Sequence, residues 1–373
     1  MRTAVRSRRC PLTTARSLAR FNPRASLTPP SPPLSRRATQ ASTLFGHGAK
    51  LPAWSATSFC TSCKMNETGA WGAWQVEPSK FTRAVVDAMR TLYPEELADR
   101  SWDNVGLLVG NSEAEGKQPK VLVTNDLTWQ VAADAIGQNV SVIVSYLLLT
   151  WQPPQDPFIF SGLKSITNDD PQQATLLRLA QAGVAVYCPH TAVDAAPKGL
   201  NTWLADIVAG PHASRRSVAV PCPADPESHS PAGYGAVGHF EAPVSLAEIL
   251  RRLASELGGL KYVMVASPVG ADMKTATVGS FGVCAGSGYD VLKKADVDLL
   301  VTGETSHHSA LRAIQQGRTL VQVFHSNSER GYLQKFLGPM LEEQLKKAVP
   351  EAQVVLSQFD KDPFTIYNVD HLG

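Results

Sequence analysis

Short apolar runs rich in β-branched residues alternate with helical patterns over most of the chain. The runs predict strands at residues 121–124, 142–144, 184–187, 261–265, 276–284, 298–302, 320–324 and 354–357. The segments between them predict helices at residues 81–92, 129–137, 171–183, 200–208, 245–257, 288–295, 307–316 and 328–349. Strands that alternate with helices are typical of βαβ units, whose strands lie parallel. The sequence therefore predicts an α/β protein with two α/β lobes and mixed, largely parallel sheets.

Composition divides the chain into four segments. Residues 65–210 are expected to form the first lobe, and residues 244–373 are expected to form the second. Residues 211–243 begin with a stretch rich in Pro, Ser and His, which predicts a connecting segment of loops. Residues 1–64 differ in composition from all of these and form a basic leader.

The leader contains nine Arg and two Lys but no Asp or Glu. An Arg-rich and Ser-rich segment without acidic residues is typical of a mitochondrial transit peptide. The alternative is an over-extended gene prediction whose true start is Met65. Translation from Met65 would place the protein in the cytoplasm or the nucleus rather than the mitochondrion.

Charge and hydropathy narrow the function classes. The whole chain carries 35 Lys and Arg against 33 Asp and Glu, so without the eleven basic residues of the leader the body has 24 basic side chains and a net charge of −9. An acidic body argues against direct nucleic-acid binding, which needs clustered positive charge. No apolar run approaches the roughly 20 residues that a membrane span requires, so we expect no membrane association.

Polar residues that can bind a metal or transfer a proton follow the ends of five predicted strands. They are Asp126, Tyr146, the pair His190 and Asp194, the group Glu304, His307 and His308, and the pair His325 and Glu329. Ligand sites in parallel α/β sheets form outside the carboxyl ends of the strands. These side chains could therefore converge on one crevice, which would be an active site rich in His and carboxylate.

His325 and Glu329 are the strongest candidates for metal ligands. An imidazole and a carboxylate presented together at a strand end suit a divalent metal. The alternative is a capping box, in which Glu329 reaches back to the backbone N–H of Ser326. Asp194 is open to two interpretations as well, because an Asp shortly before a Pro often initiates a turn, whereas beside His325 it would be a third ligand.

Glu304 and the His307–His308 pair are expected to open a helix. An acidic residue there could serve only the helix dipole. Because adjacent histidines point in different directions on a helix, at most one of the two should face a site. We expect Glu304 and His308 to lie around the ligands and to assist proton transfer.

Six short motifs occur in an order that resembles one family. They are Ser101-Trp-Asp-Asn-Val-Gly-Leu107, Thr124-Asn-Asp-Leu-Thr128, Pro189-His-Thr-Ala-Val-Asp-Ala-Ala-Pro197, Cys284-Ala-Gly-Ser-Gly288, Thr302-Gly-Glu-Thr-Ser-His-His308 and His325-Ser-Asn-Ser-Glu-Arg-Gly331. From about Phe81 onward the chain resembles the eukaryotic short form of the Nif-three-like family (NGG-one-interacting factor three), also known as GTP cyclohydrolase I type 2 homologues.

The resemblance implies two α/β lobes, a homo-oligomeric ring that is often a hexamer, and a dinuclear centre of divalent metals. By motif position, Asp194 would bind one metal, His325 the other, and Glu329 would bridge them. Mixed N/O ligation admits Zn, Mn or Fe. The activity that the family implies is hydrolase-like opening of the guanine ring of GTP, or action on another phosphorylated nucleotide.

One departure from the family pattern weakens this expectation. The family carries a metal-binding His in a Ser-Tyr-His-Pro-Pro-Ile-Phe pattern, whereas here Gln152 precedes the two prolines and an insertion follows Tyr146. A neutral amide is a poorer ligand than imidazole, so one metal position should be weakened. We interpret residues 147–158 as an alternative or mis-predicted exon. The rival function is a non-catalytic scaffold with a degenerate site, which would bind protein partners such as transcriptional regulators.

Overall fold

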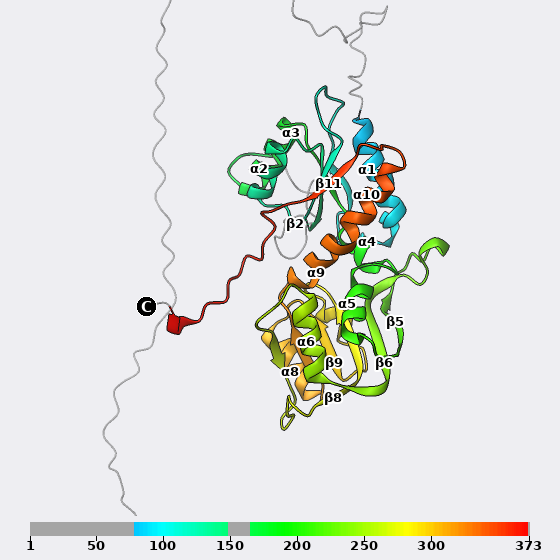
Figure 1. Cartoon of the computed structure of the whole chain (residues 1–373), viewed down its shortest axis with the longest axis vertical. Coiled ribbons are helices and arrows are strands. Elements are labelled where there is room, and N and C mark those ends of the chain that lie inside the picture. Colours follow the sequence, from blue (N-terminus) through cyan, green and yellow to red (C-terminus); the bar gives the residue numbers. More distant parts are fainter. Residues whose placement is uncertain (1–77, 148–164, 372–373) are drawn as a thin grey trace, which may run out of the picture. The chain divides into compact units, whose positions relative to one another are not determined.

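The structure is a computed structural model of the chain and describes residues 78–147 and 165–371 (Figure 1). All of these residues belong to one compact unit, Ala73–Gly373. The basic leader and the segment that contains Gln152 lie outside the described residues, so the expectations for both remain predictions.

A five-stranded sheet has the strand order β1-β4-β3-β2-β11. Its strands are β1 (Gly106–Val109), β2 (Lys120–Asp126), β3 (Val142–Leu147), β4 (Ala185–Cys188) and β11 (Gln353–Leu356). Strands β4, β3, β2 and β11 run parallel, and β1 closes one edge antiparallel to β4. Since the last strand of the chain pairs with β2, the C-terminal segment returns to the sheet built from the first half of the chain.

The alternation of side chains along β2 places helices on both faces of this sheet. Val121 and Val123 pack into the same buried cluster as Met89 of α1 (Lys80–Leu92), whereas Leu122 points to a second cluster with Val131 of α2 (Trp129–Gly137). Successive residues of a strand face opposite sides of the sheet, so a strand that is buried on both sides reads as a continuous apolar run. The sheet is therefore covered by α1 and α10 (Gly338–Lys346) on one face and by α2 and α3 (Pro171–Gln181) on the other (Figure 1).

A six-stranded mixed sheet has the order β5-β6-β8-β9-β10-β7. Its strands are β5 (Ser214–Pro221), β6 (Gly233–Ser245), β8 (Thr277–Cys284), β9 (Leu299–Thr302), β10 (Thr319–Gln322) and β7 (Met264–Ala266). Strands β8, β9 and β10 are parallel, while β5, β6 and β7 are antiparallel to their neighbours. The predicted α/β class with mixed sheets is confirmed.

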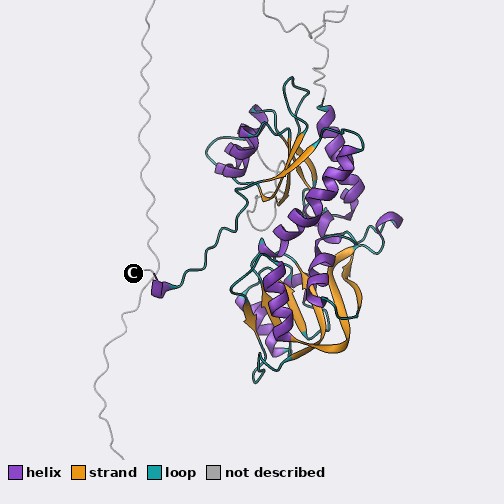
Figure 2. Ribbon diagram, in the orientation of Figure 1, coloured by secondary structure: helices purple, strands orange, loops and turns teal. Residues whose placement is uncertain are grey.

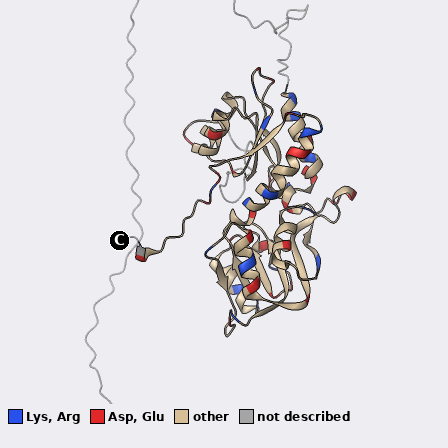
Figure 3. Ribbon diagram, in the orientation of Figure 1, with Lys and Arg blue, Asp and Glu red and all other residues tan. Residues whose placement is uncertain are grey.

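The remaining helices of the described ranges connect or cover these strands (Figure 2). They are α3 (Pro171–Gln181), α4 (His190–Ala195), α5 (Leu200–Ala209), α6 (Leu246–Glu256), α7 (Tyr289–Leu292), α8 (His307–Gln315), α9 (Asn327–Tyr332) and α10 (Gly338–Lys346). Within the described ranges, no helix is both long enough and apolar enough to cross a membrane. Acidic and basic side chains are interspersed along the outer helices (Figure 3).

The loops expected across residues 211–231 are partly wrong, because β5 occupies Ser214–Pro221. This strand forms the edge of its sheet, where a terminal Pro221 removes no hydrogen bond that a further strand would need. Strand β6 then fills most of the rest of the predicted connection. The exact division of the chain into lobes stays a prediction.

The single helix expected at residues 328–349 is interrupted. Helix α9 passes into a π-helical turn at Leu333–Leu337 before α10 begins. Pro339 has no N–H and so cannot donate to the preceding turn, which accounts for the local change in winding. Helix α6 begins without a capping box between Ser245 and Glu248, although the two residue types and their spacing would allow one. The Ser245 side chain caps no N–H of α6, and the carboxylate of Glu248 pairs with His212 and Arg252.

Candidate functional site

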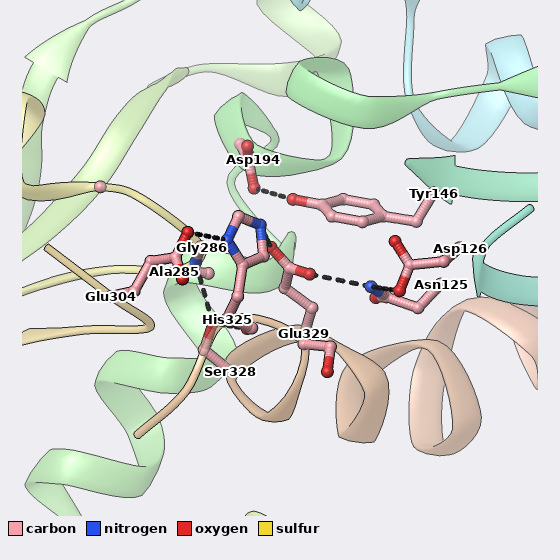
Figure 4. A network of polar contacts seen from close by, with 12 residues as sticks. Asn125, Asp126, Tyr146, Asp194, Ala285, Gly286, Glu304, His325, Ser328 and Glu329 are labelled. Atoms are coloured by element: carbon pink, nitrogen blue, oxygen red, sulfur yellow. Dashed lines mark hydrogen bonds and ion pairs between the residues drawn. The ribbon is translucent and has the colours of Figure 1, made fainter. Parts of the chain in front are cut away.

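Side chains from the strand ends of both sheets lie together in one place (Figure 4). Asn125 and Asp126 end β2, and Tyr146 lies near the end of β3. Asp194 lies on α4, the short helix that follows β4. Glu304 follows β9, while His325 and Glu329 follow β10. The term His–carboxylate cluster is used below for Asp126, Asp194, Glu304, His325 and Glu329.

His325 lies between two carboxylates. Its Nδ1 is 2.9 Å from Oε1 of Glu304, and its Nε2 is 3.3 Å from Oε1 of Glu329. Burial by itself would lower the pKa of His325, but the hydrogen bonds and charges of Glu329 and Glu304 outweigh burial and raise this pKa to about 10. The two carboxylates therefore favour the protonated form of the imidazole.

The backbone before His325 is unusual. Phe324 has a φ of +70°, in the left-handed region that residues with a side chain rarely adopt. This turn separates β10 from α9 and leads directly into His325. Local strain of this kind is typical of functional sites. Propensities alone do not predict a Phe in that conformation.

Glu329 is buried, with 2% of its side chain exposed. Its Oε2 accepts a hydrogen bond of 3.0 Å from Nδ2 of Asn125, across from the other sheet. The capping-box alternative is wrong, because the Ser326 side chain does not cap α9 and donates to Asp362 instead. Glu329 thus directs its carboxylate into the cluster rather than along its own helix.

Asp194 and Asp126 are half-buried carboxylates with altered acidity. Burial raises the pKa of Asp194 to about 6, although nearby His190 and a 2.8 Å hydrogen bond from the Tyr146 hydroxyl favour its charged form. Burial also raises the pKa of Asp126 to about 6, and the charge of Glu329 adds to this effect. Both shifts have the direction expected where buried negative charges outnumber the cations that face them.

His190 is held by a residue of the first sequence motif. Its Nδ1 lies 2.9 Å from Oδ1 of Asp103, whose Oδ2 accepts hydrogen bonds from the backbone and hydroxyl of Thr191. Trp102 and Tyr146 contact the ring of His190 edge-on. Two of the motifs that are far apart in the sequence therefore meet beside Asp194.

His308 is placed differently from Glu304. Helix α8 begins at His307 and is capped by the side chain of Ser306, so the expectation that Glu304 opens this helix is wrong. His308 is exposed, and its ring contacts His307 with centroids 5.6 Å apart. In the described ranges no hydrogen bond or ion pair joins His308 to the His–carboxylate cluster, and its role in proton transfer stays a prediction.

Whether the cluster suits a divalent metal depends on its donors and their arrangement. Among the described residues, no three His, Cys, Asp or Glu side chains already surround a common point as ligands. The donor types nevertheless fit, because imidazole and carboxylate groups bind Zn, Mn and Fe. The Oδ1 of Asn125 is buried and has no hydrogen-bond partner within the described part of the chain. It is one further oxygen donor that accepts no hydrogen bond from the described residues.

Gly286 leaves the space that this arrangement needs. A Cβ at this position would lie 2.7 Å from Oε1 of Glu329 and 3.1 Å from Nε2 of His325. Its φ of +58° also favours glycine. Its backbone N–H donates to Ser328 Oγ at 2.9 Å, which holds the loop after β8 against α9. The first glycine of the motif Cys284-Ala-Gly-Ser-Gly288 thus lies directly over the pair His325 and Glu329.

The structure adds residues that sequence reasoning missed. Asn125 was overlooked although it precedes Asp126 at the same strand end, a position that could have revealed it. Asp360 accepts a 2.9 Å hydrogen bond from the backbone N–H of Asn125, 235 positions away. No local pattern marks Asp360, because its partners are brought to it only by the pairing of β11 with β2.

The fold and the site together define a class: an α/β protein in which the strand ends of two mixed sheets bring together a partly buried group of His and carboxylate side chains. The model of the family Duf34/NIF3 (NGG1p interacting factor 3) matches residues 82–363. The chain belongs to this family, and the predicted resemblance is confirmed.

Relatives agree with this assignment, and solved structures share the fold. The chain is 42% identical over 278 residues to the Protein NIF3 homolog of Schizosaccharomyces pombe, covering 74% of this chain and 95% of the relative. It is 37% identical to the NGG1-interacting factor 3 of Saccharomyces cerevisiae, covering 77% and 98%. The crystal structure of a Bacillus cereus protein related to NIF3 superposes with a TM-score of 0.60 at 18% identity, covering 79% and 100%. Reduced HcgD from Methanocaldococcus jannaschii has a TM-score of 0.57 at 21% identity, covering 76% and 100%.

Proposed function

We propose that the chain is a metal-binding, hydrolase-like member of the NIF3 family whose His–carboxylate cluster holds two divalent ions. The observation that carries this proposal is the imbalance of charge in the cluster. Glu329 is buried and Asp126 and Asp194 are half-buried, whereas His325 is the basic side chain that lies against Glu329. Divalent ions would supply the missing positive charge, and the partnerless Oδ1 of Asn125 offers a further oxygen.

By their positions, Asp194 would bind one ion, His325 the other, and Glu329 would lie between them. Mixed N/O donors admit Zn, Mn or Fe. When bound, such ions polarise a substrate oxygen and lower the pKa of water. The substrate class that we propose is GTP or another phosphorylated nucleotide.

Glu304 has the geometry for two tasks. Its Oε1 contacts Nδ1 of His325, which would orient the imidazole so that Nε2 faces the interior of the cluster. Half of the Glu304 side chain is exposed, so it can exchange protons with water. His308, exposed on the following helix, is the second candidate for carrying protons to and from solvent.

The test is the metal content of the purified full chain, measured by inductively coupled plasma mass spectrometry. We expect about two ions per chain, and we expect His325→Ala and Glu329→Ala to lose them. His239→Ala is the matched control, because that His is exposed on β6. One ion or fewer in the unchanged chain would indicate that one metal position is weakened because the His of the Ser-Tyr-His-Pro-Pro pattern is missing.

A second candidate function is a homo-oligomeric scaffold that binds a protein partner without catalysis. It is favoured by the pairing of His325 with Glu329, which uses one candidate ligand to neutralise another. A relative from S. cerevisiae bears the name NGG1-interacting factor 3, which suggests a protein partner such as a transcriptional regulator. A chain that sediments as a ring-sized oligomer, binds no metal and leaves GTP intact would support the scaffold.

A further inference from the structure

The segment after β11 returns to the residues beside the His–carboxylate cluster and contacts two of them, Asn125 and Arg330, through a carboxylate. Asp360 Oδ2 accepts a hydrogen bond of 2.9 Å from the backbone N–H of Asn125. Its Oδ1 accepts a second hydrogen bond, of 3.1 Å, from Nε of Arg330. The side chains of Asp360 and Arg330 are 7% and 15% exposed, so water screens this ion pair little. One carboxylate thus joins the end of β2 to helix α9.

Asp362 makes a similar connection two residues later. Its Oδ2 accepts a hydrogen bond of 2.8 Å from Oγ of Ser326, the residue that follows His325. Its other oxygen accepts from the backbone N–H of Phe364, which holds the carboxylate in place. The name C-terminal clamp is used below for Asp360 and Asp362.

The contacts of the clamp flank the hydrogen bond between Asn125, at the end of β2, and Glu329 of α9. Asn125 donates its side-chain amide to Glu329, while Asp360 holds the backbone of Asn125. On the opposite side, Asp360 holds Arg330, which directly follows Glu329. Asn125 and Arg330, the residue after Glu329, are therefore anchored to the same carboxylate. Displacement of Asp360 would release both of these anchors at once.

We propose that the C-terminal clamp positions the candidate metal ligands: Asp360 sets the separation of Asn125 and Glu329, and Asp362 sets the turn that carries His325. The proposal rests on the proposed function in so far as those residues bind metal. Residues that hold ligands in place without touching the metal commonly contribute 10–100-fold to metal affinity. A C-terminus that merely stabilises the fold would contribute to the melting temperature and leave affinity unchanged.

The test compares Asp360→Ala and Asp362→Ala with Asp370→Ala in the full chain. Asp370 lies in the same C-terminal segment and is exposed, so it is a matched control. Zn²⁺ is titrated against a chromophoric chelator, and the melting temperature is recorded for each metal-free variant. We expect about 10–100-fold weaker Zn²⁺ binding in Asp360→Ala, a smaller loss in Asp362→Ala and no change in Asp370→Ala. Binding by Asp360→Ala within twofold of the unchanged chain would overturn the clamp and leave the metal site standing.

Failure of the unchanged chain to bind Zn²⁺ would contradict the proposed function and not the clamp. In that case a second measurement tests the clamp. Amide hydrogen exchange is followed by mass spectrometry in the metal-free chain. Asp360→Ala should accelerate exchange at least tenfold in peptides that contain residues 121–128 and 325–332. Peptides from β6 and β8 should remain as protected as in the unchanged chain. Equal protection of residues 121–128 and 325–332 in both proteins would overturn the clamp, as would a uniform loss of protection across the fold.

Discussion

Nε2 of His325 lies 3.3 Å from Oε1 of Glu329, four residues further along the chain. The same imidazole contacts Glu304 through Nδ1, and the same carboxylate accepts from Asn125 through Oε2. This pair therefore links both sheets, since Asn125 ends β2 of one sheet and His325 follows β10 of the other. A change at any of these contacts should reach the rest of the cluster.

Asn125→Asp should destabilise the fold strongly. The new carboxylate would replace the amide that donates to Glu329, and Asp126 and Asp360 lie beside it. We expect a loss of at least about 2 kcal/mol in the free energy of unfolding at pH 7, because a buried acceptor loses its donor and gains a like charge. Urea denaturation of the full chain would measure this loss.

The pH dependence of that variant has a definite sign. Burial among carboxylates would raise the pKa of the new Asp above its unfolded value, so the folded state would bind more protons. The destabilisation should therefore shrink as the pH falls toward about 4. Asn168→Asp on the exposed surface is the control and should change stability little at any pH. A loss that does not vary with pH would contradict the interpretation.

Gly286→Ala should cost more than the same change at another left-handed glycine. A Cβ at Gly286 would crowd the carboxylate of Glu329 in addition to straining the backbone, whereas Gly270 has a φ of +86° and nothing within 4 Å. Gly270→Ala therefore reports backbone strain alone, roughly 1 kcal/mol. We expect Gly286→Ala to lose about 1–3 kcal/mol beyond that control. Equal losses in the two variants would show that the Glu329 carboxylate moves away from the new Cβ without a cost in stability.

Asp103→Asn should reveal a stabilising contact whose strength depends on pH. Burial of Asp103 tends to raise its pKa, but hydrogen bonds and the charge of His190 outweigh burial and lower this pKa. Burial of His190 tends to lower its pKa, and Asp103 outweighs that effect and raises it. Because the pKa of Asp103 is lower in the folded chain, its ion pair stabilises the fold at pH values above about 3.9, the pKa of Asp in an unfolded chain. This contribution is lost as the pH falls through the folded pKa.

The raised pKa of His190 has the opposite consequence. It stabilises the fold fully at pH values below about 6.5, the pKa of His in an unfolded chain. That contribution is lost as the pH rises through the pKa of His190 in the folded chain. The difference between the unchanged chain and Asp103→Asn should thus be greatest between about pH 4 and pH 6.5, at roughly 1.5–3 kcal/mol. Denaturation curves at pH 3, 5.5 and 9 would measure it, with exposed Asp296→Asn as the control. A difference that is constant with pH would contradict the ion pair.

The elements of the fold follow closely from local patterns. The apolar run at residues 121–124 becomes β2, and the run at residues 320–324 becomes β10 with small changes at its ends. Such runs determine a strand because burial on both faces rewards an unbroken apolar segment. The expectation failed at residues 211–231, where Pro and Ser obscured the edge strand β5. An edge strand is exposed on one side and carries a weaker apolar pattern.

By itself the sequence determined that Asp126, Asp194, Glu304 and His325 follow strand ends, because strand ends are local features of a parallel α/β chain. Only the tertiary structure decided which of them touch. The bond from Asn125 to Glu329 spans 204 positions, and the bond from Asn125 to Asp360 spans 235. Contacts at such separations depend on how β11 pairs with β2 and on how the two sheets meet. The free energy of those arrangements is shared across the whole core, so no window of sequence contains it.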